Sequence, residues 1–288
     1  PPPPPPPTPP PPPPPPFFIP PPPTDNTTSR CSSAASDVYK RQDPNNQAAI
    51  VTGGGSGLGK ATVDALRRAG AQVAILDLQE HPDKQVLSCH CDVCDEHAVI
   101  NAIEKAEQRN GIARIVVNCA GISEATRVLG KHGPVAQAHH ERIVDVHLNG
   151  TFNVTRLMAN RMRELPELAD GERGLVVNTA SIAALEGQVG ATSYASAKAG
   201  IVGMTLPLAR EFSRYGIRVM TIAPGFFDTA MASEVSPQII GQMTGQIAFP
   251  KRFGEPSEFG HLVLAICRNR MLNGETIRLD GGARMTSA

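Results

Sequence analysis

The sequence predicts an α/β fold: a single doubly wound domain with about seven parallel strands and helices on both faces of the sheet. Short apolar runs alternate with helical patterns from Ala48 onward. Such alternation implies parallel pairing, because each crossover then carries a helix back over the sheet. The 243 residues that follow residue 45 suit one domain of this kind better than two small ones.

Seven short apolar runs are predicted as strands, at residues 48–52, 72–77, 86–91, 114–118, 175–179, 218–223 and 276–279. Six longer segments are predicted as helices, at residues 58–69, 95–109, 136–164, 193–215, 237–246 and 256–269. In the second helix one face carries Ala98, Val99, Ala102, Ile103 and Ala106 at helical spacing. Pro207 lies inside the fourth helix, where we expect a kink rather than a boundary.

Residues 1–46 differ in composition from the rest of the chain. Of the 28 prolines, 20 precede residue 46, and residues 1–23 are nearly all proline. Such a run adopts polyproline II and buries no core, so we predict a disordered tail. Residues 36–42 resemble translated adapter sequence, and we interpret the tail as an artefact or an inert extension. A ligand for SH3-like or WW-like grooves is the alternative. The domain is predicted over residues 47–288.

Charge and hydropathy restrict the partners. The 27 Lys and Arg residues balance 27 Asp and Glu residues, giving a formal net charge of zero. This balance argues against nucleic acid and anionic membrane surfaces as partners. No run approaches the ~18 apolar residues of a membrane span. The expected partner is therefore a small molecule.

The six cysteines form no evident disulfide framework, which predicts reduced thiols and a cytoplasmic location. The mitochondrial matrix is the alternative, because the tail would hide a targeting peptide. Residues 89–97 hold several potential zinc ligands, but no second ligand pair follows at a suitable distance. Strand alternation instead places Cys89 and Cys91 on one face as small apolar fillers. We expect no metal.

A glycine-rich loop, residues 52–59, follows the first strand and opens the first helix. This context indicates a Rossmann-type dinucleotide site, with Gly53 in the turn, Gly57 near the pyrophosphate and Gly59 in helix packing. Asp77 ends the second strand, where a carboxylate can bind the adenosine ribose hydroxyls and would repel the extra phosphate of NADP. The neutral Ser56 and the residues after Asp77 offer that phosphate no positive charge. The sequence therefore favours NAD.

Tyr194 and Lys198 are four residues apart on a predicted helix and so share one face. A neighbouring ammonium favours the phenolate, so the pair can transfer protons nearer neutrality than a free tyrosine. Ser181 lies 13 residues before Tyr194, at the carboxyl end of a predicted strand, where open α/β sheets keep their ligand crevice.

Taken together, the loop 52–59, the turn 118–121, Ser181, the Tyr194/Lys198 pair and Pro224-Gly225 resemble the short-chain dehydrogenase/reductase family. The resemblance runs from about residue 47 to 285. Within that family, residues 184–190, 200–207, 219–225 and 272–282 look like the type-2 3-hydroxyacyl-CoA dehydrogenases, which also oxidise hydroxysteroids.

The resemblance implies a role for each matching residue. Tyr194 would be the general acid/base, Lys198 would hold the nicotinamide ribose and lower the pKa of Tyr194, and Ser181 would stabilise the substrate oxygen. The implied cofactor-binding residues are Gly53, Ser56, Gly57, Leu58, Gly59, Asp77, Asp92, Val93, Asn118, Ala120, Gly121, Tyr194, Lys198, Pro224, Gly225 and Thr229. Of these, Asp92 and Val93 would border the adenine and Thr229 would bind the carboxamide.

Two positions depart from the family pattern. Cys119 replaces an asparagine, as it does in related dehydrogenases. His147 replaces an asparagine that supports a water relay from the lysine to bulk solvent. His147 could maintain this relay, make it pH-sensitive, or be a buried and satisfied histidine, and the sequence leaves these alternatives open. Asn149 is a poor substitute because it points elsewhere on the helix.

Residues 123–134 and 226–251 are predicted as the loops that set substrate specificity. The second is apolar at Met231, Ile239, Ile240, Met243 and Ile247, which suits an acyl chain or a steroid. Basic residues that could meet a CoA phosphate are Arg127, Lys131, Lys251 and Arg252. The implied function is NAD-dependent interconversion of a secondary alcohol and a ketone, on a 3-hydroxyacyl-CoA. A hydroxysteroid or small-alcohol dehydrogenase and an NAD-binding scaffold with weak turnover are the alternatives. The resemblance also implies a homotetramer.

Overall fold

The computed structural model describes residues 44–79, 81, 83, 85–122, 125–229 and 237–286, with the side chain of Pro237 left out. The predicted tail therefore lies outside the described residues, except for its last three. Met231 and residues 123 and 124 of the predicted specificity loops also lie outside them.

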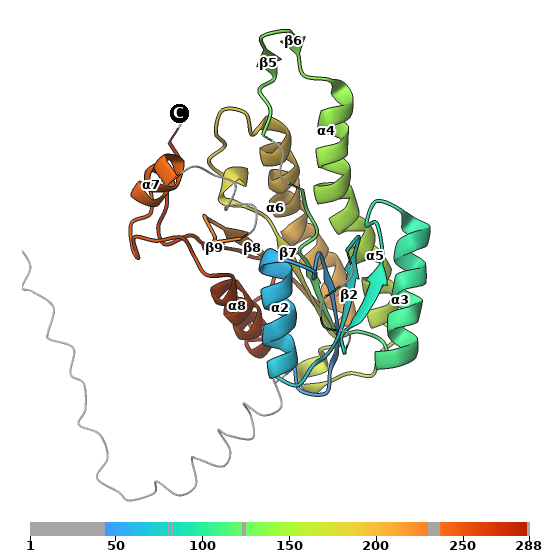
Figure 1. Ribbon diagram of the computed structural model, residues 1–288. Helices are drawn as coiled ribbons and strands as arrows, with labels where there is room; N and C mark the ends of the chain where they lie inside the picture. Colours follow the sequence, from blue (N-terminus) through green and yellow to red (C-terminus); the bar gives the residue numbers. More distant parts are fainter. Residues whose placement is uncertain are drawn as a thin grey trace, which may run out of the picture. The chain divides into compact units, whose positions relative to one another are not determined.

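Seven parallel strands form one sheet in the order β3-β2-β1-β4-β7-β8-β9, which confirms the predicted fold (Figure 1). Their bounds are β1 Ala48–Thr52, β2 Gln72–Asp77, β3 Leu87–His90, β4 Ile115–Asn118, β7 Gly174–Thr179, β8 Ile217–Pro224 and β9 Thr276–Leu279. The order reverses direction at β1 and β4, whose carboxyl ends meet at Thr52 and Asn118. Ligands of open α/β sheets bind at this kind of switch point.

Helices cover both faces of the sheet. Their bounds are α2 Gly57–Arg68, α3 Glu96–Asn110, α4 Gln137–Val144, α5 Gly150–Met162, α6 Thr192–Phe212, α7 Pro237–Gly245 and α8 Pro256–Arg268. One core cluster packs α3, α5 and α6 on the sheet, and the other packs α2 and α8 on the opposite face. Strand alternation divides the two clusters, since Ile50 belongs to the first and Val51 to the second.

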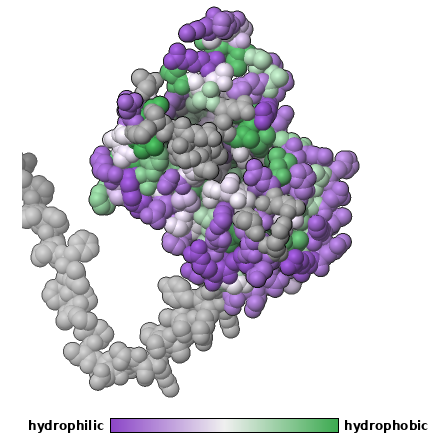
Figure 2. Space-filling view, viewed as in Figure 1, coloured by the Kyte–Doolittle hydropathy of each residue, from purple (hydrophilic) through white to green (hydrophobic). Residues whose placement is uncertain are grey.

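Cys89 and Cys91 belong to the same core cluster, each 2% exposed, which confirms their role as apolar fillers. Helix α6 continues through Pro207 to Phe212, so the proline is not a helix boundary. No helix in the described part of the chain is long and apolar enough to cross a membrane. Figure 2 shows mainly hydrophilic side chains on the face drawn, with apolar ones in small groups.

Two features were not predicted. The segment predicted as one helix over 136–164 contains a π-helical turn, Asp145–Asn149, between α4 and α5. The predicted loop 123–134 carries a short antiparallel hairpin, β5 Leu129–Gly130 and β6 Gly133–Pro134, which projects beyond α4 and α6 (Figure 1). Short 3-10 turns at Ala169–Gly171, Ile182–Ala184 and Ser213–Tyr215 complete the elements of the described residues.

Candidate functional site

The glycine loop lies directly against the turn that follows β4. Gly53 has a φ of +64°, and a Cβ there would lie 2.7 Å from the backbone of Ala120. The Thr52 hydroxyl accepts hydrogen bonds from the backbone N–H groups of Cys119 and Ala120, both at 3.1 Å. Only glycine satisfies both the left-handed backbone and the close approach at residue 53. At the switch point, the backbone of residue 53 therefore packs directly against the backbone of the turn that follows β4.

The N-terminus of α2 is open to an anion. Ser56, the N-cap residue, makes no side-chain cap hydrogen bond, and the first turn carries no acidic side chain. Among the described residues, a Cβ at Gly57 would meet only Thr229, at 3.6 Å, whereas a Cβ at Gly59 would overlap the Gly53 carbonyl oxygen. Free N–H groups and the helix dipole at such an end suit a pyrophosphate.

Asp77 is bound into this loop. Its carboxylate accepts a hydrogen bond from Gly55 N–H at 2.8 Å and another from Gln79 N–H at 2.9 Å. The carboxylate thus lies at the carboxyl end of β2 beside the glycine loop, as predicted. Its hydrogen bond to Gly55 was not predicted, because a contact across 22 residues leaves no local pattern in the sequence.

The other predicted cofactor residues are placed unevenly. Thr229 lies opposite Gly57. Asp92 is exposed, but the side chain of Val93 is buried against the Cα of Gly150, so only its backbone can face an adenine. Asn118 is also buried: its side chain donates to Asn178 at 2.8 Å and to Thr155 at 3.1 Å. Its side chain therefore braces the sheet rather than lining the cleft. Leu58 is partly buried and packs on the core cluster beneath α2 and α8. Pro224 ends β8, and the Gly225 N–H that follows it donates to the Leu279 carbonyl.

Ser181, Tyr194 and Lys198 converge at the carboxyl end of β7. Ser181 caps the 3-10 turn after that strand, with its hydroxyl accepting from Ala183 N–H at 3.1 Å. Helix α6 supplies Tyr194 and Lys198, and the Lys198 ammonium lies 5.7 Å from the centre of the tyrosine ring. Lys198 is 4% exposed and donates to the Thr179 carbonyl at 2.6 Å.

Burial shifts both titrating groups toward their neutral forms. It raises the pKa of Tyr194, and a hydrogen bond with Ser181 opposes this rise to a smaller extent. Burial also lowers the pKa of Lys198 to about 8, against the opposing influence of Cys119. Burial is thus the main influence on both groups, and the lowering of the tyrosine pKa by Lys198 stays a prediction.

His147 is the fourth member of this cluster. Its ring packs edge to face on Tyr194, with centroids 5.1 Å apart, and the side chain is only 3% exposed. The Nε2 atom lies 2.8 Å from the Ile122 carbonyl and 3.2 Å from the Ile122 N–H. One ring nitrogen serves only one of these groups, and the shorter contact favours donation to the carbonyl. Nδ1 is then a buried acceptor without a hydrogen-bond partner among the described residues.

Burial first, and the Lys198 charge second, lower the pKa of His147 to about 3. The imidazole is thus neutral across the physiological range, which disfavours the pH-sensitive alternative. The other two alternatives, a relay residue and a buried histidine, stay predictions. The π-helical turn presents His147 inward, while Asn149 is exposed and donates to Asp145. A Cβ at residue 121 would lie 2.6 Å from His147 Cε1, so Gly121 makes room for the ring.

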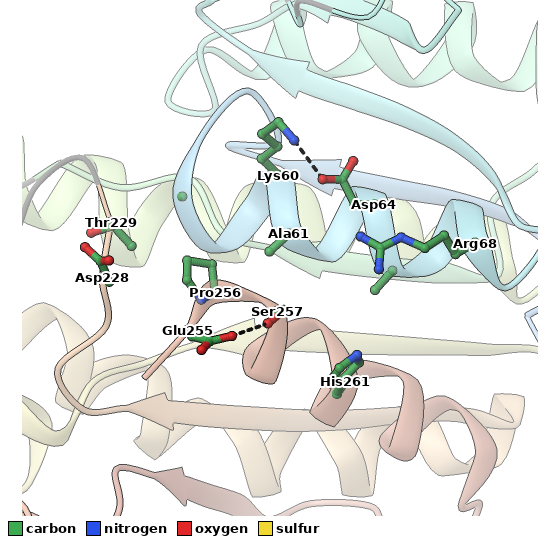
Figure 3. A pocket seen from close by; sticks show the side chains of 12 residues that line it. Lys60, Ala61, Asp64, Arg68, Asp228, Thr229, Glu255, Pro256, Ser257 and His261 are labelled. Atoms are coloured by element: carbon green, nitrogen blue, oxygen red, sulfur yellow. Dashed lines mark hydrogen bonds and ion pairs between the residues drawn. The ribbon is translucent and has the colours of Figure 1, made fainter. Parts of the chain in front are cut away.

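A cavity of about 610 Å³ lies between α2 and α8, on the outer side of the glycine loop (Figure 3). Gly57 and Thr229 border it, together with Lys60, Asp64, Arg68, Glu255 and His261. Lys60 is paired with Asp64 at 2.7 Å. None of Ser181, Tyr194 and Lys198 lines this cavity, so it adjoins the cofactor side of the site rather than the reacting side.

The predicted substrate residues divide into two groups. Lys251 donates to the Ile247 carbonyl at 2.5 Å, and Arg252 makes a two-bond ion pair with Glu258, so both are engaged within the protein. Arg127 and Lys131 lie exposed in and beside the hairpin. Of the apolar residues of the second wall, Ile247 is buried and Ile239 is 48% exposed. Among the described residues, no cluster of three or more His, Cys, Asp or Glu side chains is arranged to hold a metal ion.

Comparisons with known proteins agree with this geometry. A family model described as short chain dehydrogenase matches residues 47–240. Human 3-hydroxyacyl-CoA dehydrogenase type-2 is 44% identical over 240 residues, covering 80% of this chain and 92% of that protein. Ipsdienol dehydrogenase from Ips pini is 34% identical over 237 residues, covering 80% and 94%. The crystal structure of 3-hydroxyacyl-CoA dehydrogenase type-2 from Mycobacterium avium aligns with a TM-score of 0.80 at 39% identity, covering 84% and 98%.

Proposed function

Since the chain belongs to the short-chain dehydrogenase family, we propose that it is an NAD-dependent oxidoreductase that interconverts a 3-hydroxyacyl-CoA and a 3-ketoacyl-CoA. The observation that carries the proposal is the convergence of Ser181, Tyr194 and Lys198 at the sheet end that also holds the glycine loop. An enzyme of this family uses a nicotinamide dinucleotide, which supplies the acceptor or donor of hydride.

The residues present fit that cofactor. Residues 53–59 and the open N-terminus of α2 would hold the pyrophosphate. Asp77 would accept the ribose hydroxyls, and its negative charge supports NAD over NADP. The neighbouring Leu78 is 58% exposed and carries no positive charge to balance the extra phosphate of NADP. Thr229 is the candidate for the carboxamide, because it faces Gly57 across the loop.

In the oxidising direction, the deprotonated Tyr194 oxygen would take the proton of the substrate hydroxyl, and the cofactor would accept the hydride of the carbinol C–H. In the reducing direction, the same oxygen returns the proton to the carbonyl oxygen. Ser181 donates to the substrate oxygen as charge develops there. Lys198, held by the Thr179 carbonyl, supplies positive charge beneath the phenol, and His147 fixes the ring.

The human relative supports an acyl-CoA substrate at 44% identity, and the exposed cations Arg127 and Lys131, beside and in the hairpin, are compatible with its phosphates. Ipsdienol dehydrogenase, at 34% identity, supports a small alcohol as the second candidate.

We also propose a homotetramer: Phe152 on α5 and Leu206 on α6 are 46% and 44% exposed and offer an apolar contact. Light scattering tests it. A cytoplasmic location is proposed from the free cysteines, and cell fractionation tests it.

The first experiment follows NADH oxidation with acetoacetyl-CoA, for the wild type and for Tyr194→Phe, with NADPH as the control cofactor. We expect NADH-dependent turnover that the substitution abolishes while NADH binding persists. Turnover of steroids or short alcohols alone would replace the acyl-CoA assignment. Tight NADH binding without turnover on any of these substrates would favour a scaffold protein.

A further inference from the structure

The last described residues form a strap that contacts the loop after Ser181 and the segment after α7. This C-terminal strap, residues 280–286, begins after β9 with two consecutive left-handed glycines, Gly281 at φ +61° and Gly282 at φ +74°. Gly282 N–H donates to the Asp280 side chain at 3.0 Å, and Ala283 N–H donates to the Asp280 carbonyl at 3.1 Å. The turn directs the chain back over the molecule instead of away from it.

The strap is bonded to the predicted substrate wall that follows α7. The Gly281 carbonyl accepts from the N–H groups of Ala248 and Phe249, at 3.1 and 3.0 Å. A Cβ at residue 281 would lie 2.8 Å from Ile247, so the glycine is required for this contact. Ala283 is fully buried in a cluster with Ile247 and Ile182, and Ile182 directly follows Ser181.

The strap is also bonded to the loop that follows Ser181. One carboxylate oxygen of Glu186 accepts from Arg278 at 2.7 Å, and the other accepts from Met285 N–H at 2.9 Å. Arg278 in turn donates to Asp280 at 2.7 Å and to the Ala283 carbonyl at 2.8 Å. The Glu186 carboxylate therefore joins its own loop to residues about a hundred positions away. Its hydrogen bond with Arg278 also pairs opposite charges, which strengthens it.

We propose that Glu186 is a positioning residue for Ser181: through Arg278 and Met285 it fastens the Ser181 loop to the C-terminal strap, which fixes that loop against the substrate wall. The proposal rests on the proposed function. Glu186 does not contact the reacting atoms, so its effect passes through the orientation of the Ser181 hydroxyl. Without the carboxylate the Ser181 loop is held less firmly, which lowers kcat more than it lowers the affinity for the cofactor.

The test compares Glu186→Ala in the wild type and in a Ser181→Ala background, with acetoacetyl-CoA and NADH. Glu167→Ala is the matched control, because it removes a carboxylate that pairs with an arginine, Arg173 at 2.8 Å, which is not a residue of the strap. We expect Glu186→Ala to lower kcat about 10-fold in the wild type and less than about 2-fold without Ser181, because both changes act on one group. NADH affinity and the control variant should match the wild type.

Hydrogen–deuterium exchange supplies a readout that does not depend on the substrate. Glu186→Ala should increase exchange in residues 182–190 and 246–249 and leave residues 53–63 unchanged. Equal loss of kcat in both backgrounds, or unchanged exchange in 182–190, would overturn the proposal. Absence of turnover in the wild type, with the expected exchange pattern, would instead count against the proposed function alone.

Discussion

The imidazole of His147 stands at 89° to the phenol ring of Tyr194, with the two ring centroids 5.1 Å apart. This edge-to-face contact couples the π-helical turn to the residue that we propose moves the proton. The same histidine is anchored by Ile122, so it fixes Tyr194 from a rigid support.

Substituting His147 separates the contribution of its ring contact with Tyr194 from that of its hydrogen bond to Ile122. His147→Asn can still bond Ile122 but loses the ring contact, so we expect kcat within about 3-fold of wild type and a lower melting temperature. His147→Phe keeps a ring but leaves buried groups of Ile122 unpaired, which should cost about 1–3 kcal/mol of stability. Because the pKa of His147 is about 3, the pH profile between pH 5 and 8 should have the same shape in wild type and His147→Asn. A lost acid limb in the variant would contradict this assignment.

Stability should rise with pH through the titration of Lys198. Its pKa is lowered by burial to about 8, against 10.5 in the unfolded chain, so the unfolded state binds more protons between these values. The unfavourable burial of the charge is relieved as the pH rises through this window, by roughly 3 kcal/mol at most. Urea unfolding of wild type and Lys198→Met from pH 7 to 10 measures it. The stability difference between the two proteins should carry this slope, because the opposing titrations of Cys91 and Cys267 are common to both and cancel.

Asp77 should decide between the two nicotinamide cofactors. Asp77→Asn keeps an oxygen for Gly55 N–H but removes the charge, so we expect the kcat/KM ratio of NADH to NADPH to fall about 10-fold or more. The measurement is steady-state kinetics with each cofactor at a fixed substrate concentration. An unchanged ratio would mean that the carboxylate only braces the loop.

Two glycines should respond oppositely to alanine. A Cβ at residue 59 would overlap the Gly53 carbonyl, so Gly59→Ala should cost roughly 3 kcal/mol or more and abolish cofactor binding. A Cβ at Gly241, inside α7, meets no described residue within 4 Å, so Gly241→Ala should stabilise the protein by about 0.5–1 kcal/mol. Thermal unfolding with and without NADH measures both. Equal effects would show that helix propensity, not the contact with Gly53, governs residue 59.

Local patterns were sufficient for the sheet and for the residue types of the site. The apolar runs that end at Thr52 and Asp77 are strands with the predicted ends, because burial on both faces leaves a continuous apolar signal. The spacing of Tyr194 and Lys198 likewise placed both on one helix, since helical period is a local property.

Features set by long-range contact could not be predicted. The π-helical turn at His147 depends on packing against Ile122 and Tyr194, and helical periodicity does not record an inserted residue. The inward side chain of Asn118 depends on partners in β7 and α5. Glu186 lies in the stretch 184–190 that carries the family resemblance, but the sequence did not indicate its contacts, because its partners Arg278 and Met285 lie about a hundred positions away.

The bond between Glu186 and Met285 also sets an order of events during synthesis. Protein chains emerge from the ribosome N-terminus first, so the sheet from β1 to β8 can assemble while the strap is still being made. The contact between the Ser181 loop and the strap forms only after residue 285 has emerged, when Arg278 and Met285 can bond the Glu186 carboxylate. A product terminated between β8 and β9 would carry the glycine loop, Tyr194 and Lys198 and still lack this contact. Such a fragment could bind a dinucleotide without turning over a substrate.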